Sequence, residues 1–267
     1  MEKDFAQEQR LDILLDAFMD ELLQQGDRQK PYSITEKRQL LRSLMNIRRP
    51  GSMSKELLSV QDKYLKSIIE QKGIVRLSDI PVMRDGISIW QGDITRLAVD
   101  AIVNAANSQM LGCFVPLHTC IDNCIHTFAG VQLRGECYRQ MNRLKEKYGS
   151  NYEQPTAVPL LTDGYNLPAK KIIHVVGPIV VNALTKDLED ALAMCYKNVL
   201  DMCRDNGLRS VAFCCISTGV FHFPNKRAAE IATETVSAWI KAHPGQLERV
   251  IFNVFKDEDR SYYEQLI

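Results

Sequence analysis

The chain begins with a long stretch in which apolar residues recur at helical spacing. Between residues 5 and 25 they repeat every three or four positions, and Gly26 follows as a stop signal. These apolar residues are Leu11, Leu14, Leu15, Phe18 and Leu22. A second run opens with a Ser33-x-x-Glu36 capping-box pattern, and a third covers residues 54–72. The pattern therefore predicts a helical extension over residues 1–75.

From about residue 76 the pattern changes to short apolar runs separated by amphipathic stretches. The apolar runs cover 87–92, 101–107, 157–162, 171–177, 210–217 and 249–255. The amphipathic stretches, at 119–147, 186–206 and 227–243, predict helices. Apolar strands between helices are typical of a central sheet that is covered on both faces. We therefore expect a three-layer α/β/α domain over residues 76–267, with ligands bound beyond the carboxyl ends of its strands.

Composition is that of a globular protein without a dominant charge. Of the 267 residues, 45% are hydrophobic and 25% are charged, which is enough to build a core. Lys+Arg and Asp+Glu both number 33, so the formal net charge is zero. A neutral chain has no long-range attraction to phosphate backbones, and we expect no nucleic-acid partner.

The N-terminus is charged from its second residue, and no later run approaches the ~18 apolar residues of a membrane span. We therefore expect no membrane partner and a cytoplasmic location, where thiols stay reduced. The dispersed cysteines are expected in the core: Cys137, Cys195, Cys203, Cys214 and Cys215.

The remaining three cysteines crowd into one segment, LGCFVPLHTCIDNCIHTFAG, at residues 111–130. The same segment holds two of the five histidines, His118 and His126. Such a set of soft ligands is explained either by a metal site or by a buried helix start that favours small apolar side chains.

Four segments at predicted strand ends carry polar or glycine-rich patterns. They are QGDITRL (91–97), NAANSQM (104–110), the Cys/His segment, and ISTGVFHFP (216–224). Taken singly, each is compatible with an ordinary turn. Taken in order, with I-D-x-x-I-H (121–126), I-I-H-x-V-G-P (172–178) and VIFNVF (250–255), they resemble the macrodomain family. The resemblance spans residues 76–267 and is closest to the ADP-ribosyl hydrolase branch.

This resemblance implies a mixed central sheet and an ADP-ribose site. Asp93 and Ile94 would hold the adenine, with Phe255 at its flank. The diphosphate would lie on the amides of a single loop. The residues of that loop are Ser217, Thr218, Gly219, Val220 and Phe221. Backbone amides near a helix start bind anions without any net charge on the protein.

At the other end of the ligand, the resemblance places Asn107, Cys120, Ile121 and Asp122 near the distal ribose. Asn107 and Asp122 would be the catalytic residues. From the sequence alone, Asp122 is equally compatible with an N-cap of the following helix, and Asn104 and Asn107 with turn residues. His174 is expected to be a buried core histidine, whereas His222 is either a rim residue or a loop residue without function.

One loop departs from the hydrolase branch. The usual glycine-rich loop before I-D-x-x-I-H keeps only Gly112, and Asn123 replaces a further glycine. The segment resembles that of zinc-containing macrodomains, which carry a C-x-x-x-x-H-x-C pattern. This implies zinc ligands at Cys113, His118 and Cys120, with the fourth tetrahedral position free. Cys124 and His126 remain competing ligands, because spacing does not exclude them.

Together these patterns predict a zinc-dependent hydrolase that removes mono-ADP-ribose from modified protein side chains, with Asp or Glu as the favoured acceptor. The alternatives are a non-catalytic ADP-ribose-binding module and an O-acetyl-ADP-ribose deacetylase. The resemblance also implies two partners beyond the ADP-ribosylated substrate. They are a sirtuin-type ADP-ribosyltransferase and a lipoyl-carrier protein of the glycine-cleavage H type.

Overall fold

The computed structural model describes residues 6–22 and 31–267. The N-terminal region forms three helices: α1 (Gln7–Leu22), α2 (Ile34–Ile47) and α3 (Lys55–Lys72). Ser33 is the N-cap of α2: its side chain accepts a hydrogen bond from the Glu36 amide at 3.2 Å, which is one of the two bonds of the predicted capping box, and its hydroxyl donates to the Glu36 carboxylate at 2.6 Å. The predicted stop at Gly26 lies outside the described residues. The apolar faces of the helices form a core of their own, in which Leu14, Leu15 and Phe18 are fully buried.

The second region is built on a six-stranded sheet. Its strands are β2 (Ile87–Gln91), β4 (Ala101–Ala106), β5 (Leu160–Asp163), β6 (Lys171–Val176), β7 (Ser210–Phe213) and β8 (Arg249–Val254). The spatial order is β2-β8-β7-β4-β6-β5, and all neighbours are parallel except β5 and β6. The sheet is therefore mixed, as expected. A separate parallel pair joins β1 (Val75–Arg76) to β3 (Leu97–Ala98).

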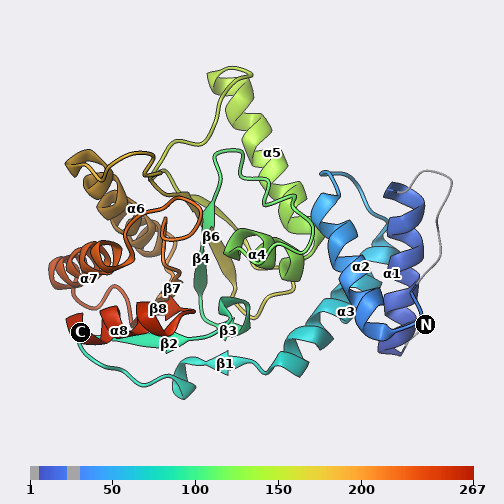
Figure 1. The fold of residues 1–267 in the computed structure, drawn as a ribbon, viewed down its shortest axis with the longest axis horizontal. Coiled ribbons are helices and arrows are strands. Elements are labelled where there is room, and N and C mark those ends of the chain that lie inside the picture. Colours follow the sequence, from blue (N-terminus) through green and yellow to red (C-terminus); the bar gives the residue numbers. More distant parts are fainter. Residues whose placement is uncertain (1–5, 23–30) are drawn as a thin grey trace.

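Helices cover both faces of this sheet (Figure 1). The elements are α4 (Ile121–Ala129), α5 (Val131–Tyr148), α6 (Lys186–Asp205), α7 (Asn225–Ala242) and α8 (Asp257–Leu266). Figure 1 shows α6, α7 and α8 on one side of the strands and α4 and α5 on the other, with α1–α3 packed beyond α4. None of the described helices is long and apolar enough to cross a membrane.

Most of the predicted elements are present, and the differences are local. The stretch 119–147, predicted as one helix, is two helices separated at Gly130, whose φ is +97°. A φ of this value strains any residue with a β-carbon, and such an atom would also lie 2.7 Å from the side-chain ends of Gln61 and Gln132, so the position favours glycine. The C-terminal helix α8 was not predicted. The expected boundary between residues 75 and 76 falls inside β1, which pairs with a strand of the second region.

The parallel strands end at one edge of the sheet, and this positions the predicted site. Asp93 follows β2, Asn107 follows β4, residues 217–221 follow β7, and Phe255 follows β8. Because these strands are parallel neighbours, segments far apart in the sequence meet at this edge.

Candidate functional site

Asp93 stands at the end of β2 with both carboxylate oxygens engaged. Its Oδ1 accepts hydrogen bonds from the amide and hydroxyl of Thr95, and its Oδ2 pairs with Lys72 Nζ at 2.9 Å. Burial would raise the pKa of Asp93, but hydrogen bonds from Thr95 and Lys72 outweigh burial and lower it. A carboxylate has about four acceptor positions, so one remains for a further donor such as a purine amine. Ile94, the next residue, is buried.

The loop after β7 presents unpaired amides toward the same edge. Thr218 and Phe223 use their amides for turns within the loop. Within the described chain, no hydrogen bond uses the amides of Ser217, Gly219, Val220 or Phe221. The Ser217 hydroxyl is also buried without a partner, 2.1 Å from the position that a β-carbon on Gly177 would occupy. This arrangement is a backbone cradle of the kind that binds an anionic group.

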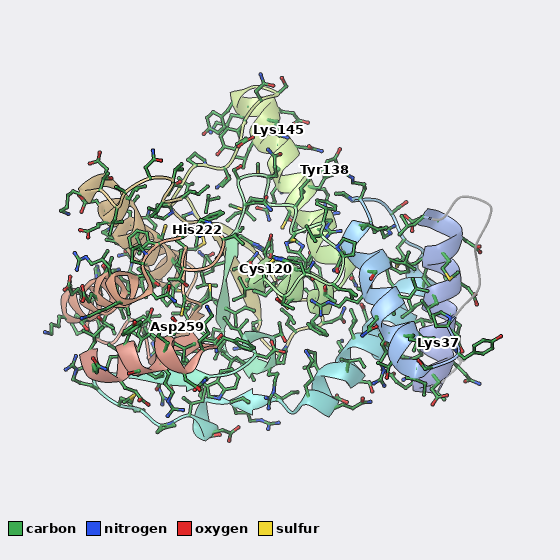
Figure 2. The ribbon with its side chains drawn as sticks, in the orientation of Figure 1. Lys37, Cys120, Tyr138, Lys145, His222 and Asp259 are labelled. Carbon is green, nitrogen blue, oxygen red and sulfur yellow. The ribbon has the colours of Figure 1, made fainter. Side chains whose placement is uncertain are left out.

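Two aromatic residues, Phe221 within this loop and Phe255 after the neighbouring strand β8, were expected at the site. Phe255 directly follows β8 and is 77% exposed, which leaves its ring free to contact a planar ligand. Phe221 is half-buried against the cluster that contains Met110 and Val176. His222, by contrast, is exposed at a φ of +56°, on a loop separate from Cys120 (Figure 2).

Asn107 and Asp122 meet directly. The Asn107 Nδ2 atom donates to the Gly112 carbonyl at 3.2 Å and to Asp122 Oδ2 at 3.4 Å. Asn104 lies inside β4 and donates from Nδ2 to the other carboxylate oxygen, Oδ1, at 2.8 Å. Asn104 also lies 3.0 Å from His174 Nδ1, and both residues are fully buried. The turn alternative for Asn104 is therefore wrong, whereas the expectation of a core histidine at His174 is confirmed.

The Asp122 carboxyl is 5% exposed, in the first turn of α4. Burial raises its pKa to about 6, although the Asn104 hydrogen bond and the nearby Arg134 charge lower it. The capping alternative for Asp122 is wrong, since the N-cap of α4 is Cys120. The Cys120 Sγ accepts from the Asn123 amide at 3.4 Å. The Asp122 carboxylate is thus held by Asn104 and Asn107 and does not cap the helix.

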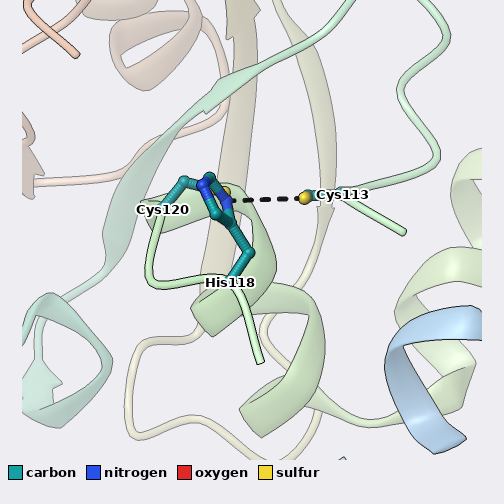
Figure 3. Close-up of side chains that lie close together, drawn as sticks. All are labelled: Cys113, His118 and Cys120. Atoms are coloured by element: carbon teal, nitrogen blue, oxygen red, sulfur yellow. Dashed lines mark hydrogen bonds between the residues drawn. The ribbon is translucent and has the colours of Figure 1, made fainter. Parts of the chain in front are cut away.

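Cys113, His118 and Cys120 come together in front of α4 (Figure 3). Their ligand atoms lie within 4.8 Å of one another, and Cys113 Sγ is 3.6 Å from His118 Nδ1. Zn–S and Zn–N bonds of about 2.3 and 2.0 Å at tetrahedral angles place the two donors about 3.5 Å apart. All three side chains are half-buried, which leaves access for a fourth ligand. These residues fit a tetrahedral zinc ion.

The competing ligands point elsewhere. The Cys124 Sγ lies 3.9 Å from the Thr119 carbonyl and 3.7 Å from Arg42 Nη2. The His126 ring lies behind Asp122, with its Nε2 3.5 Å from Asp122 Oδ1. Burial raises the pKa of Cys120 to about 12, and the Cys113 and Asp122 charges add to that rise. A cation between the two sulfurs would stabilise their thiolate forms.

Two residues of this site were not predicted from the sequence. Lys72, from the N-terminal extension, pairs with Asp93 and lies 3.5 Å from the centre of the Phe128 ring. Asn104 fixes the Asp122 carboxylate. No short-range pattern identifies Lys72, which ends a helix of ordinary composition. Asn104 was visible as the first residue of the N-A-A-N motif.

Comparison with known proteins agrees with this geometry. The Macro domain family model matches residues 103–232. A protein-ADP-ribose hydrolase of Treponema medium is 49% identical over 90% of this chain and 90% of its own length. A probable bifunctional ADP-ribose hydrolase/ADP-ribosyltransferase of Fusarium oxysporum is 40% identical over 85% of this chain and 40% of its own, longer chain.

Among solved structures, the Trypanosoma brucei macrodomain in complex with ADP-ribose superposes with a TM-score of 0.63 at 27% identity. That match covers 88% of this chain and 96% of the other. The same fold, the family model and the extended identity lead to one conclusion: the chain belongs to the macrodomain family.

Proposed function

We propose that this protein is a zinc-dependent hydrolase that removes mono-ADP-ribose from modified protein side chains, with Asp and Glu esters as its substrates. The name of the Treponema relative supports the hydrolase activity. The single observation that carries the proposal is the pair formed by Asn107 Nδ2 and Asp122 Oδ2, 3.4 Å apart, with Asp122 in the first turn of the helix that Cys120 caps. An ADP-ribose reader does not require this pair.

The nucleotide half of the site would bind the part of the substrate that does not react. Asp93 would accept a hydrogen bond from the adenine amine, and Phe255 would cover the ring. The unpaired amides of residues 217–221 would hold the diphosphate. This binding places the distal ribose beside Asn107 and Asp122, and the energy of the remote contacts contributes to orienting the reacting bond.

The reaction adds water across the bond between ribose C1″ and the acceptor carboxylate, giving ADP-ribose and the free acid. Asn107 would donate a hydrogen bond to the ribose, and Asp122 would orient the water or hydroxyl that takes part. Asn104 holds the Asp122 carboxylate at this position through Oδ1. Zinc bound by Cys113, His118 and Cys120 would supply a Lewis acid at its fourth position.

The proposal includes two protein partners: an ADP-ribosyltransferase that adds the modification and a carrier protein that bears it. The Fusarium relative carries hydrolase and transferase in one name, which supports a functional partner that adds ADP-ribose. A sirtuin-type transferase, a lipoyl-carrier substrate protein and a cytoplasmic location remain predictions from the sequence.

Variants at the ribose end test this proposal. Asn107→Ala and Asp122→Ala should each slow release by about a hundredfold or more, because positioning and proton transfer are lost. Free ADP-ribose should still bind both variants within a few-fold of wild type. The measurement is single-turnover release of radiolabelled ADP-ribose from an aspartate-modified protein, paired with a binding titration for each variant.

Asp93→Ala is the matched variant at the nucleotide end. It should weaken binding of free ADP-ribose about ten- to a hundredfold, since one charge-assisted hydrogen bond is lost. Wild-type protein that contains zinc and binds ADP-ribose, yet releases nothing from any modified acceptor, would establish a binding module instead. Faster cleavage of O-acetyl-ADP-ribose than of any modified protein would favour the deacetylase.

A further inference from the structure

Helix α2 of the N-terminal extension is hydrogen-bonded to the loop that carries the metal ligands. Arg42 Nη2 donates to the His118 carbonyl at 2.7 Å, and Asn46 Oδ1 accepts from the Leu117 amide at 3.0 Å. Asn46 is fully buried, and its Nδ2 donates to Thr127 Oγ1 at 2.9 Å. Arg42 and Asn46 lie one turn apart on α2. Together they bond the backbone amide of Leu117 and the backbone carbonyl of His118.

The contact extends to Cys113 through Asn123. Arg42 Nη2 also donates to Asn123 Oδ1 at 3.0 Å. The Asn123 Nδ2 in turn donates to the carbonyls of Cys113 at 3.3 Å and Val115 at 3.0 Å. Because Asn123 is fully buried, water does not compete for these bonds in the folded structure. The backbone at two of the three ligands is therefore linked, directly or through Asn123, to one guanidinium of the extension.

A buried cation, Arg134, fixes the end of α2 itself. Arg134 of α5 donates from Nη1 to the carbonyls of Met45, Asn46 and Arg48, and from Nε to the Leu111 carbonyl. The end of α2 and the start of the metal loop are thus tied to the same side chain. Phe114 of the loop lies against this guanidinium, 4.3 Å from its ring centre.

Apolar packing contributes less beside Leu117. Helices α2, α3 and α4 line a pocket of about 590 Å³, whose wall includes Arg42, Met45 and Leu117. The Leu117 side chain is 40% exposed, and its φ of +57° is unfavourable for a leucine. The hydrogen bond from its amide to Asn46 stabilises this conformation. The polar contacts, rather than side-chain packing, hold this part of the loop.

We infer that the N-terminal extension is part of the metal site, and that Arg42 and Asn46 are positioning residues that hold the ligand loop in its metal-binding geometry. The inference rests on the zinc ion in the proposed function. Partners that orient metal ligands raise metal affinity about 10- to 100-fold. Here they come from a separate helical region, which gives that region a role beyond packing.

The test compares zinc affinity in full-length variants by competition with a chromophoric chelator. Arg42→Gln and Asn46→Ala should each bind zinc about 10- to 100-fold more weakly than wild type. Leu44→Ala is the matched control on the same helix. It removes a side chain buried in the core of the extension, so it should lower stability but keep zinc affinity within a few-fold.

Hydrogen exchange of residues 113–120, measured with chelator present, gives a readout that does not depend on metal. Exchange should be faster in Arg42→Gln and Asn46→Ala and unchanged in Leu44→Ala. Wild-type zinc affinity and exchange in both variants would overturn the inference while leaving the proposed zinc ion intact. If Leu44→Ala lost as much zinc affinity and protection from exchange as the other two variants, loss of stability would explain all three results. That outcome would overturn the inference as well. A wild-type protein that binds no zinc would overturn both proposals.

Discussion

The described residues contain two clusters of cysteine and histidine that look alike in composition. The outer cluster is Cys113, His118 and Cys120, and the inner cluster is His126, Cys137 and His174. In each, the ligand atoms lie within 4.8 Å of one another. The outer side chains are half-buried in a loop, whereas every inner side chain is at most 5% exposed. Asp122 lies between them, in the same helix as His126.

Hydrogen bonding separates the two clusters further. In the inner cluster, His174 Nδ1 lies 3.0 Å from Asn104 Nδ2, and its Nε2 lies 3.0 Å from Thr162 Oγ1. Both ring nitrogens of His174 therefore have protein partners, so its one lone pair is not free for a metal. The two ring nitrogens of His126, in contrast, are buried without a hydrogen-bond partner among the described residues. Burial lowers the pKa of His174 to about 3, so the ring is neutral at neutral pH. Close approach of soft ligands does not by itself make a metal site; a position that the ion can reach is also needed, and only the outer cluster offers one.

The difference between the outer and the inner cluster should have its largest effect on the metal content of cysteine variants. Cys113→Ser and Cys120→Ser should each reduce zinc from about one ion per chain to a trace, since a structural thiolate ligand is lost. Cys137→Ser, in the inner cluster, should retain about one ion. Elemental analysis of protein purified without chelator measures this. Zinc retained in both outer variants and lost in Cys137→Ser would exchange the roles of the two clusters.

A smaller effect, on stability, is expected at Gly112. This residue directly precedes Cys113 of the outer cluster and lies against the ring of His126 of the inner cluster. Its φ is +81°, its carbonyl accepts from Asn107, and a β-carbon would lie 2.7 Å from the His126 ring. Gly112→Ala should lower the free energy of unfolding by about 2–4 kcal/mol, through left-handed strain and contact with that ring.

Gly207→Ala is the control for Gly112→Ala. Gly207 also has a positive φ, +65°, but a β-carbon there meets nothing within 4 Å. Only the backbone strain of about 1–2 kcal/mol should then appear in urea unfolding. Equal losses in the two variants would mean that the His126 ring moves aside freely and that the inner cluster is not rigid.

The two clusters also show what the sequence could predict. The three outer residues fall within eight positions, and the family resemblance proposed Cys113, His118 and Cys120 from a set that spacing alone did not narrow. The structure brings these three together. The inner residues come from α4, α5 and β6 and meet only in the folded chain. The strands of the sheet were predicted to within a few residues because each is an apolar run between polar segments. Helix α8 escaped prediction because it is short and mostly polar.

The contribution of the extension was hidden for a similar reason. Arg42 and Asn46 lie on an amphipathic helix whose pattern predicts packing and nothing more. Their partners at Leu117 and His118 are more than seventy positions away, and both accept or donate through the backbone. Because every residue type has a backbone carbonyl, and all but proline a backbone amide, these contacts cannot be recognised from the residue types of the loop. Only the folded structure relates α2 to the proposed metal ligands.

The last prediction concerns the pH dependence that the inner cluster confers. The folded pKa of His174, about 3, is below the ordinary value of 6.5, so between these values the unfolded chain binds one more proton. Its contribution to stability is therefore complete above pH 6.5 and is lost as the pH falls toward 3. Asp122, whose pKa burial raises to about 6, has the opposite effect on acidification. The difference between wild type and a His174 variant isolates the histidine.

In zinc-free protein, the free energy of unfolding should fall by about 1.4 kcal/mol per pH unit more in wild type than in His174→Asn between about pH 5.5 and 4. The variant will be less stable overall, but the slope is the measured quantity, from urea unfolding at several pH values. Cys137→Ser should keep the wild-type slope, because burial raises the pKa of that thiol and it does not titrate in this range. Equal slopes in wild type and His174→Asn would show that His174 takes up a proton without unfolding. The inner cluster would then be as accessible to protons as the outer one, and burial would no longer distinguish them.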